Sequence, residues 1–224
     1  MKLRNILLTT FAASAFVVGG TSCSDSFLDE KMYSNYGPEV SDVNAKLVGL
    51  HRQYAAIWGM SGQQGFVGCW QVGTDVGAPG DTQGVEVPFY RYQELNAENA
   101  GVSFLWEKLY ELINSANQII ASQAEGGDAA ATAEAMFFRA YAYNMLVTLW
   151  GDVPLVTEST SIPRTDYTRN AVAEVDGVID SDLVYAMSNL PIVGAAKNES
   201  RINQDMARPV SYTHLRAHET AANL

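Results

Sequence analysis

The chain has few cysteines, few basic residues and no long apolar run, and each shortage excludes a class of protein. Its 224 residues include 2 Cys, so it has no disulfide scaffold, and no C-x-x-C pair is present to hold zinc. Lys and Arg number 14 against 25 Asp and Glu, a formal net charge of −11 that disfavours nucleic acid as a partner. The overall composition, with 47% hydrophobic and 17% charged residues, is typical of a folded domain or of part of a larger one.

Sequence motifs of catalysis are also missing. There is no nucleophile elbow, P-loop, dinucleotide-binding fingerprint or zinc motif. Acidic residues are numerous, but no pair is marked out as general acid and base, because carboxylates spread along helices mostly lie on solvated faces. The sequence therefore predicts no catalytic residue, no metal ligand and no cofactor, and it favours a binding protein over an enzyme.

The N-terminus has the features of an export signal. Two basic residues precede an uncharged apolar run at 6–18, which is too short to span a membrane, and small residues lead from it to Cys23. Small residues directly before a cysteine resemble the cleavage site of a bacterial lipoprotein, although Gly20 occupies the position where an aliphatic residue is usual. We predict a lipoprotein signal peptide at 1–22 and lipidation at Cys23, and an ordinary signal peptide with an incidental cysteine is the alternative.

An acidic stretch follows the cysteine. Its residues at 24–30 read S-D-S-F-L-D-E. This stretch resembles the tether that directs lipoproteins to the outer face of the outer membrane in Bacteroidetes, and a solvated linker is equally compatible with it. We therefore expect an acidic N-terminal tether at 23–38.

The middle of the chain predicts a mainly α fold. Apolar residues recur at steps of three and four in the segments 39–58, 104–120, 128–150 and 170–189. Glycine breaks separate these segments, and paired helices of this kind are typical of a tetratricopeptide-like stack, although the spacing is too irregular for a strict repeat. Residues 60–103 lack helical periodicity, and a stretch of this length is expected to be a long irregular binding loop.

Two strings of residues carry a family resemblance. They are W-x3-Y-x2-I-x2-A-N-x-I-I at 106–120 and A-E-A-M-F-F-R-A-Y-x-Y-x2-L-x2-L-W-G-D-V-P-L at 133–155. Together they resemble the SusD/RagB family of nutrient-uptake outer-membrane lipoproteins, and the likeness runs from Met1 to about Arg208. It implies a SusD-like N-terminal helical domain at 39–208 that is incomplete, because family members continue into further helices and a C-terminal subdomain.

The resemblance also implies a function. It implies a surface-exposed lipoprotein, anchored in the outer membrane and facing the exterior, that binds glycan and passes it to a SusC-like TonB-dependent transporter. The alternative is a non-catalytic helical-repeat scaffold lipoprotein that binds only protein partners. Neither reading involves nucleic acid or a cofactor.

The irregular loop supplies the candidate ligand-binding residues. Sugar recognition requires flat rings that stack on sugar faces and planar polar side chains that bond hydroxyl groups. Gly73-Thr74-Asp75 also resembles the family's T-D-E stretch, with Val76 in place of glutamate, although an aspartate forms turns just as readily. The predicted ligand-binding residues are Trp70, Asp75, Asp81, Tyr90, Arg91 and Tyr92, with Trp58 as an alternative ring.

Other residues are expected to be structural. Arg139 lies on an otherwise apolar helix, so it is expected to pair with a carboxylate or with carbonyl groups between helices. Several rings at helical spacing are expected in the core: Trp106, Tyr110, Phe137, Tyr141 and Tyr143.

The C-terminal segment departs from the family pattern. Pro209 is expected to end a helix as it begins, and 209–224 resembles translated adapter sequence, so we predict a non-native tail there. The alternative is a metal site made by His214, His218 and Glu219 at zinc-helix spacing.

Overall fold

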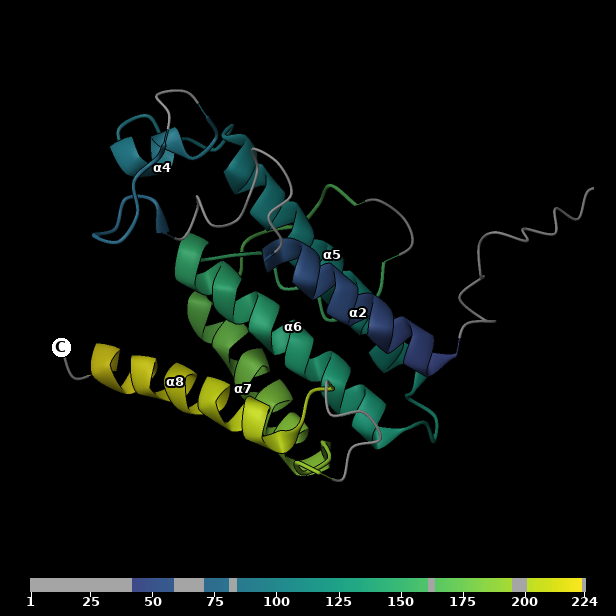
Figure 1. Cartoon of the computed structure of the whole chain (residues 1–224). Coiled ribbons are helices and arrows are strands. Elements are labelled where there is room, and N and C mark those ends of the chain that lie inside the picture. The colour runs from purple at the N-terminus through teal and green to yellow at the C-terminus, as the bar shows by residue number, and fades with distance from the viewer. Residues whose placement is uncertain (1–41, 59–70, 81–83, 161–163, 195–200, 223–224) are drawn as a thin grey trace, which may run out of the picture. The chain divides into compact units, whose positions relative to one another are not determined.

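The computed structural model describes residues 42–58, 71–80, 84–160, 164–194 and 201–222. The signal peptide, Cys23 and the acidic tether lie outside the described residues, as do Trp70 and Asp81. The described helices are α2 (Val43–Trp58), α4 (Val87–Arg91), α5 (Ala100–Ser122), α6 (Ala129–Trp150), α7 (Val172–Asn189) and α8 (Gln204–Ala222) (Figure 1).

The mainly α fold is confirmed. All four long helices expected from the periodicity are present, with ends that differ by a few residues, and within the described residues the only β pairings are isolated bridges. The short helix α4 interrupts the segment that was expected to be wholly irregular. None of the helices in the described segments is long and apolar enough to cross a membrane.

Helix α6 is the centre of the packing. It contacts α2, α5, α7 and α8, and α7 also contacts α8 (Figure 1). Buried residues lie on every side of α6, and its buried alanines allow the neighbouring helices to approach closely. The largest side chains buried within it belong to Phe138, Tyr143 and Leu146.

The helix ends follow the capping residues in the sequence. Asp128 caps α6 by accepting a hydrogen bond from the backbone N–H of Ala130 at 2.9 Å, and Asn99 caps α5 by accepting one from Gly101 at 2.8 Å. Gly151 ends α6 with a φ of 71°, a left-handed value that favours glycine.

The expectation that Pro209 ends a helix is wrong, because α8 continues through it to Ala222. Asn203 starts this helix by accepting a hydrogen bond from the N–H of Met206 at 3.1 Å. Proline has no backbone N–H and so lacks one helix hydrogen bond, but buried residues after Pro209 pack on the neighbouring helices and hold α8 in place. Ser211 and His214 are buried, and His214 Nδ1 lies 3.0 Å from Asn144 Oδ1 on α6.

Candidate functional site

Four of the six predicted ligand-binding residues lie in the segment before α5. Asp75 is exposed in a tight turn, where Thr74 Oγ1 donates a hydrogen bond to the carbonyl of Gln71 at 2.7 Å. Among the described residues the Asp75 side chain has no hydrogen-bond partner. The turn is therefore held by Thr74, and the Asp75 carboxylate is left available to solvent.

The other three described residues lie at the end of α4. Tyr90 and Tyr92 are 49% and 66% exposed, and Arg91 Nη1 lies 3.2 Å from Glu94 Oε1. The Tyr92 hydroxyl donates a hydrogen bond to the carbonyl of Gly73 at 2.7 Å, which ties the end of α4 to the turn that carries Asp75. Thus two rings and a guanidinium lie at the end of α4, and one hydrogen bond ties this end to the turn that carries the Asp75 carboxylate.

A cavity of about 400 Å³, here called the α4 cavity, adjoins this segment. It is largely apolar, and none of the four described candidates (Asp75, Tyr90, Arg91 and Tyr92) lines it. It is lined by Phe89, Leu95, Asn96, Ala97, Val102, Leu105, Leu149 and Trp150. Phe89 belongs to α4, next to Tyr90, so one short helix contributes both to the cavity wall and to the exposed rings.

A second cavity, of about 420 Å³ and here called the α5 cavity, lies between α5 and the connection from α6 to α7. Helix α5 contributes Trp106, Tyr110, Ile113 and Asn114, and the connection contributes Pro154, Val156, Thr160, Arg164, Thr165 and Tyr167. Trp106 and Tyr110 were expected in the core; both are partly buried and pack against it, and they also line this cavity. Helical spacing could not show that the non-helical connection would lie against them.

Side-chain hydrogen bonds hold the extended connection against α5 and α6. The Tyr110 hydroxyl donates to the carbonyl of Pro154 at 2.8 Å, and Asn117 Nδ2 donates to the carbonyl of Val156 at 2.9 Å. Tyr143 bonds both backbone groups of Val156, at 2.7 and 3.0 Å. Burial raises the pKa of Tyr110, and burial raises that of Tyr143 to about 12, so both phenols remain neutral donors.

Beneath the connection lies a buried ion pair. Arg139 Nε and Nη2 each donate to Asp182 at 2.7 Å, and Nη1 donates to Asn117 Oδ1 at 2.7 Å. This confirms that Arg139 pairs with a carboxylate between helices. Burial raises the pKa of Asp182, while the hydrogen bonds from Arg139 oppose that rise. The role of this pair is to hold α5, α6 and α7 in place.

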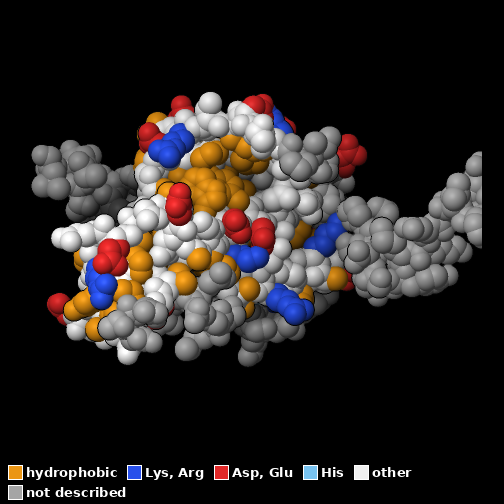
Figure 2. All heavy atoms as spheres, turned by 90° about the horizontal axis from the view of Figure 1, so that it is seen from above, with side chains coloured by type: hydrophobic (Ala, Val, Ile, Leu, Met, Phe, Trp, Pro, Cys, Tyr) orange, Lys and Arg blue, Asp and Glu red, His pale blue; other side chains and the backbone are white. Residues whose placement is uncertain are grey.

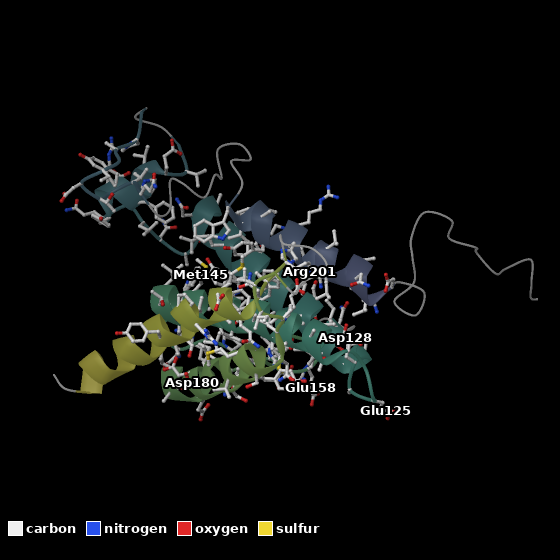
Figure 3. All side chains as sticks on the ribbon, turned by 60° about the horizontal axis from the view of Figure 1, so that its bottom comes forward. Glu125, Asp128, Met145, Glu158, Asp180 and Arg201 are labelled. Carbon is white, nitrogen blue, oxygen red and sulfur yellow. The ribbon has the colours of Figure 1, made fainter. Side chains whose placement is uncertain are left out.

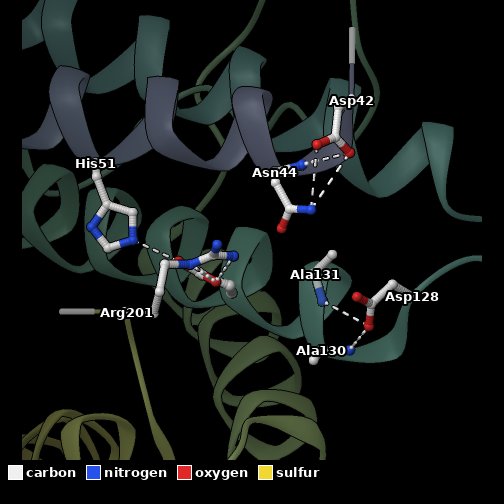
Figure 4. Close-up of polar contacts among 8 residues, drawn as sticks. Asp42, Asn44, His51, Asp128, Ala130, Ala131 and Arg201 are labelled. Atoms are coloured by element: carbon white, nitrogen blue, oxygen red, sulfur yellow. Dashed lines mark hydrogen bonds and ion pairs between the residues drawn. The ribbon is translucent and has the colours of Figure 1, made fainter. Parts of the chain in front are cut away.

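A second polar cluster joins α2 and α6 to the segment before α8 (Figure 4). His51 Nε2 lies 2.5 Å from Glu134 Oε1, and Arg201 Nε donates to the same buried carboxylate at 2.8 Å. Within the described part of the chain there is no group of three or more His, Cys, Asp or Glu side chains placed to hold a metal ion.

Part of the surface is apolar. Figure 2 shows a patch of hydrophobic side chains with acidic and basic side chains near it, and further hydrophobic side chains elsewhere on the same face. Trp58, the alternative ring, is 39% exposed and packs against Tyr54 and Tyr141, with ring centroids 6.2 and 6.5 Å apart. Its contacts make it part of the junction between α2 and α6.

The sequence matches a SusD-like family described as starch-binding and associating with the outer membrane, over residues 26–208. SusD-like protein P25 of Formosa agariphila is 28% identical over 225 residues, which cover 91% of this chain and 41% of that protein. SusD-like protein P2 of the same organism is 36% identical over 106 residues, 42% of this chain and 20% of that one. The chain thus spans less than half the length of either relative.

Solved structures agree with the fold. A laminarin-binding SusD-like protein has a TM-score of 0.63 at 23% identity, over 80% of this chain and 41% of its own. Surface glycan-binding protein A of Bacteroides uniformis has a TM-score of 0.65 at 19% identity, and the match covers 80% of this chain and 42% of that protein. Because the family match covers most of the chain and the helical arrangement agrees with these structures, the protein belongs to the SusD-like family.

Proposed function

We propose that the protein is a non-catalytic lipoprotein of the outer membrane, anchored through Cys23 and facing the exterior. In this role it binds an oligosaccharide and passes it to a SusC-like TonB-dependent transporter. The observation that carries the proposal is the exposed end of α4 with Tyr90, Arg91 and Tyr92, which the hydrogen bond from Tyr92 to Gly73 ties to the turn that carries Asp75 in a SusD-like chain. Two similar structures support it, since one is of a laminarin-binding protein and the other holds a xylogluco-oligosaccharide.

The chemistry of the segment suits a neutral sugar. Exposed tyrosine rings offer apolar faces for stacking, while the guanidinium and the carboxylate can bond hydroxyl groups. The link from Tyr92 to Gly73 orders the ring before a ligand arrives, which lowers the entropy lost on binding. Trp70 and Asp81 belong to the same proposed site.

Calorimetric titration of the whole chain with laminarihexaose, a xyloglucan heptasaccharide and maltoheptaose tests the proposal. We expect binding to at least one sugar and a loss of tenfold or more in affinity for the Tyr90→Ala/Tyr92→Ala variant. Tyr212→Ala, which removes a 61% exposed ring from α8, is the matched control and should leave affinity unchanged. Heat with none of the three sugars contradicts glycan binding and favours the protein-only scaffold.

The anchor and the transporter need a separate experiment. We expect the wild-type chain to fractionate with outer membranes and to co-purify with a TonB-dependent transporter, and a Cys23→Ala variant to leave the membrane fraction. Retention of that variant contradicts the lipid anchor. Release of reducing sugar from any of the three oligosaccharides contradicts a non-catalytic role.

A further inference from the structure

We propose that the α5 cavity is a second saccharide subsite, which takes one neutral sugar ring of the oligosaccharide bound by the protein. This inference rests on the proposed function and deepens it, because it places part of the ligand at rings for which the sequence predicted only a structural role. The cavity volume, about 420 Å³, lies within the range of small-molecule sites, about 300–1,000 Å³.

Aromatic rings from two segments line the cavity. Trp106 and Tyr110 lie side by side on α5 with ring centroids 5.0 Å apart, and Tyr167 comes from the connection and is 39% exposed. Rings presented on more than one wall suit a sugar, whose apolar C–H faces stack on aromatic surfaces. The hydrogen bond from Tyr110 to Pro154 fixes one ring in position without a ligand.

Polar groups of the described lining accompany the rings. Asn114 Oδ1 accepts a hydrogen bond from the N–H of Thr160 at 3.1 Å, so the orientation of the amide is set. Its Nδ2, the Trp106 indole N–H and the Thr165 hydroxyl make no hydrogen bond with any described residue. These groups can bond ring hydroxyls and so distinguish a sugar from a purely apolar ligand.

The charges around the cavity favour a neutral ligand. Arg164 is the charged residue in its lining, and both its Nε and Nη2 donate to Asp166, at 2.9 and 2.8 Å. The guanidinium also lies 5.2 Å from the centroid of the Tyr167 ring. Because Asp166 balances the charge of Arg164, the described lining of the cavity offers no unpaired cation to a phosphate or a carboxylate.

The position of the cavity indicates one extended ligand. Trp106 lines the α5 cavity and Trp150 lines the α4 cavity, and the two rings contact edge to face with centroids 5.4 Å apart. The two cavities therefore lie next to this tryptophan pair, and Phe89 of the α4 cavity is followed in α4 by the exposed Tyr90. In this arrangement one oligosaccharide extends from the exposed tyrosines toward the α5 cavity.

The test compares the two subsites in the whole chain with the same three oligosaccharides. We expect Tyr167→Ala and Asn114→Leu each to weaken binding by tenfold or more, with Tyr212→Ala again as the control. Circular dichroism and urea unfolding verify that each variant is folded. An independent measurement is the indole N–H signal of Trp106 in ¹H–¹⁵N spectra of the wild-type chain, assigned with Trp106→Phe, which should shift on addition of sugar.

The outcomes separate this inference from the proposed function. Suppose that the wild-type chain binds sugar and that Tyr90→Ala/Tyr92→Ala weakens binding. If both cavity variants then stay within twofold of the wild-type affinity and the Trp106 signal does not move, the second subsite is wrong and the proposed function stands. If no sugar binds to the wild-type chain, the proposed function and the subsite both fail. A shift of the Trp106 signal in the wild-type chain supports the subsite even if a cavity variant fails to fold.

Discussion

Arg139 and Asp182 show how a single buried residue can hold several elements. Both side chains are almost fully buried, and the guanidinium also donates to Asn117 and to the carbonyl of Thr157. Removing two charges from water is costly, so the pair is favourable only because its geometry and hydrogen bonds are nearly complete. Loss of one partner therefore leaves the other charge buried and uncompensated.

We expect Asp182→Asn to lower the free energy of unfolding by about 3–5 kcal/mol, since it leaves Arg139 buried without its counter-charge. Asp180→Asn is the control, because Asp180 lies on the same helix and is 42% exposed at its side chain, and it should change stability by about 1 kcal/mol or less. Urea unfolding followed by circular dichroism measures both. Equal effects of the two substitutions would contradict the role of the pair.

The buried phenol of Tyr143 predicts sensitivity to alkaline pH. Its pKa is raised to about 12 by burial from an ordinary value of 10, so the folded state resists deprotonation that the unfolded state permits. The stability it contributes is complete below pH 10 and is lost as pH rises toward 12, by on the order of 2 kcal/mol.

Urea midpoints measured between pH 8 and pH 11.5 test this prediction for the wild-type chain and Tyr143→Phe. The variant is expected to be less stable at pH 8, because it loses two hydrogen bonds to Val156, but to decline less steeply above pH 10. Burial also raises the pKa of Tyr110 and Tyr141, so some decline persists. An equally steep decline in the variant contradicts the assignment to Tyr143.

At the scale of the helix, the start of α6 depends on its cap. Asp128 and Glu125 both lie at the turn between α5 and α6 (Figure 3), but only Asp128 bonds the first free N–H groups of the helix (Figure 4). Asp128→Ala should lower stability by about 1 kcal/mol. Glu125→Ala, which removes an exposed carboxylate from the same turn, should have little effect on the thermal midpoint. A comparable loss in both variants shows that charge, and not capping, is responsible.

Helix α8 gives a further prediction. Its buried residues beyond Pro209 pack against α6 and α7, and His214 Nε2 lies 3.6 Å from Asp176 Oδ1. A chain that ends at Arg208 should therefore have a lower urea midpoint, and His214→Ala should reproduce part of that loss, about 1 kcal/mol for its contact with Asn144. No change after truncation contradicts a packing role for this part of α8.

At the scale of the whole molecule, the chain spans less than half the length of its curated relatives. The boundaries predicted at residues 22, 38 and 208, and the non-native origin of 209–224, stay predictions. Genomic sequence downstream of codon 208 tests the last of these. A helix in this segment does not decide its origin, because a foreign segment with helical periodicity can pack on an exposed helix face.

The sequence by itself determined the long helices, the need of Arg139 for a polar partner between helices, and the family, because periodicity and the string around Arg139 are local in the chain. Only the tertiary structure decided that Trp106 and Tyr110 line a cavity, and that a helix continues through Pro209. Both outcomes depend on contacts between segments distant in sequence. Hydrogen bonds of Asn117 and Tyr143 hold the connection against α5 and α6, and Asn144 contacts His214. Spacing along one chain segment contains no information about such contacts.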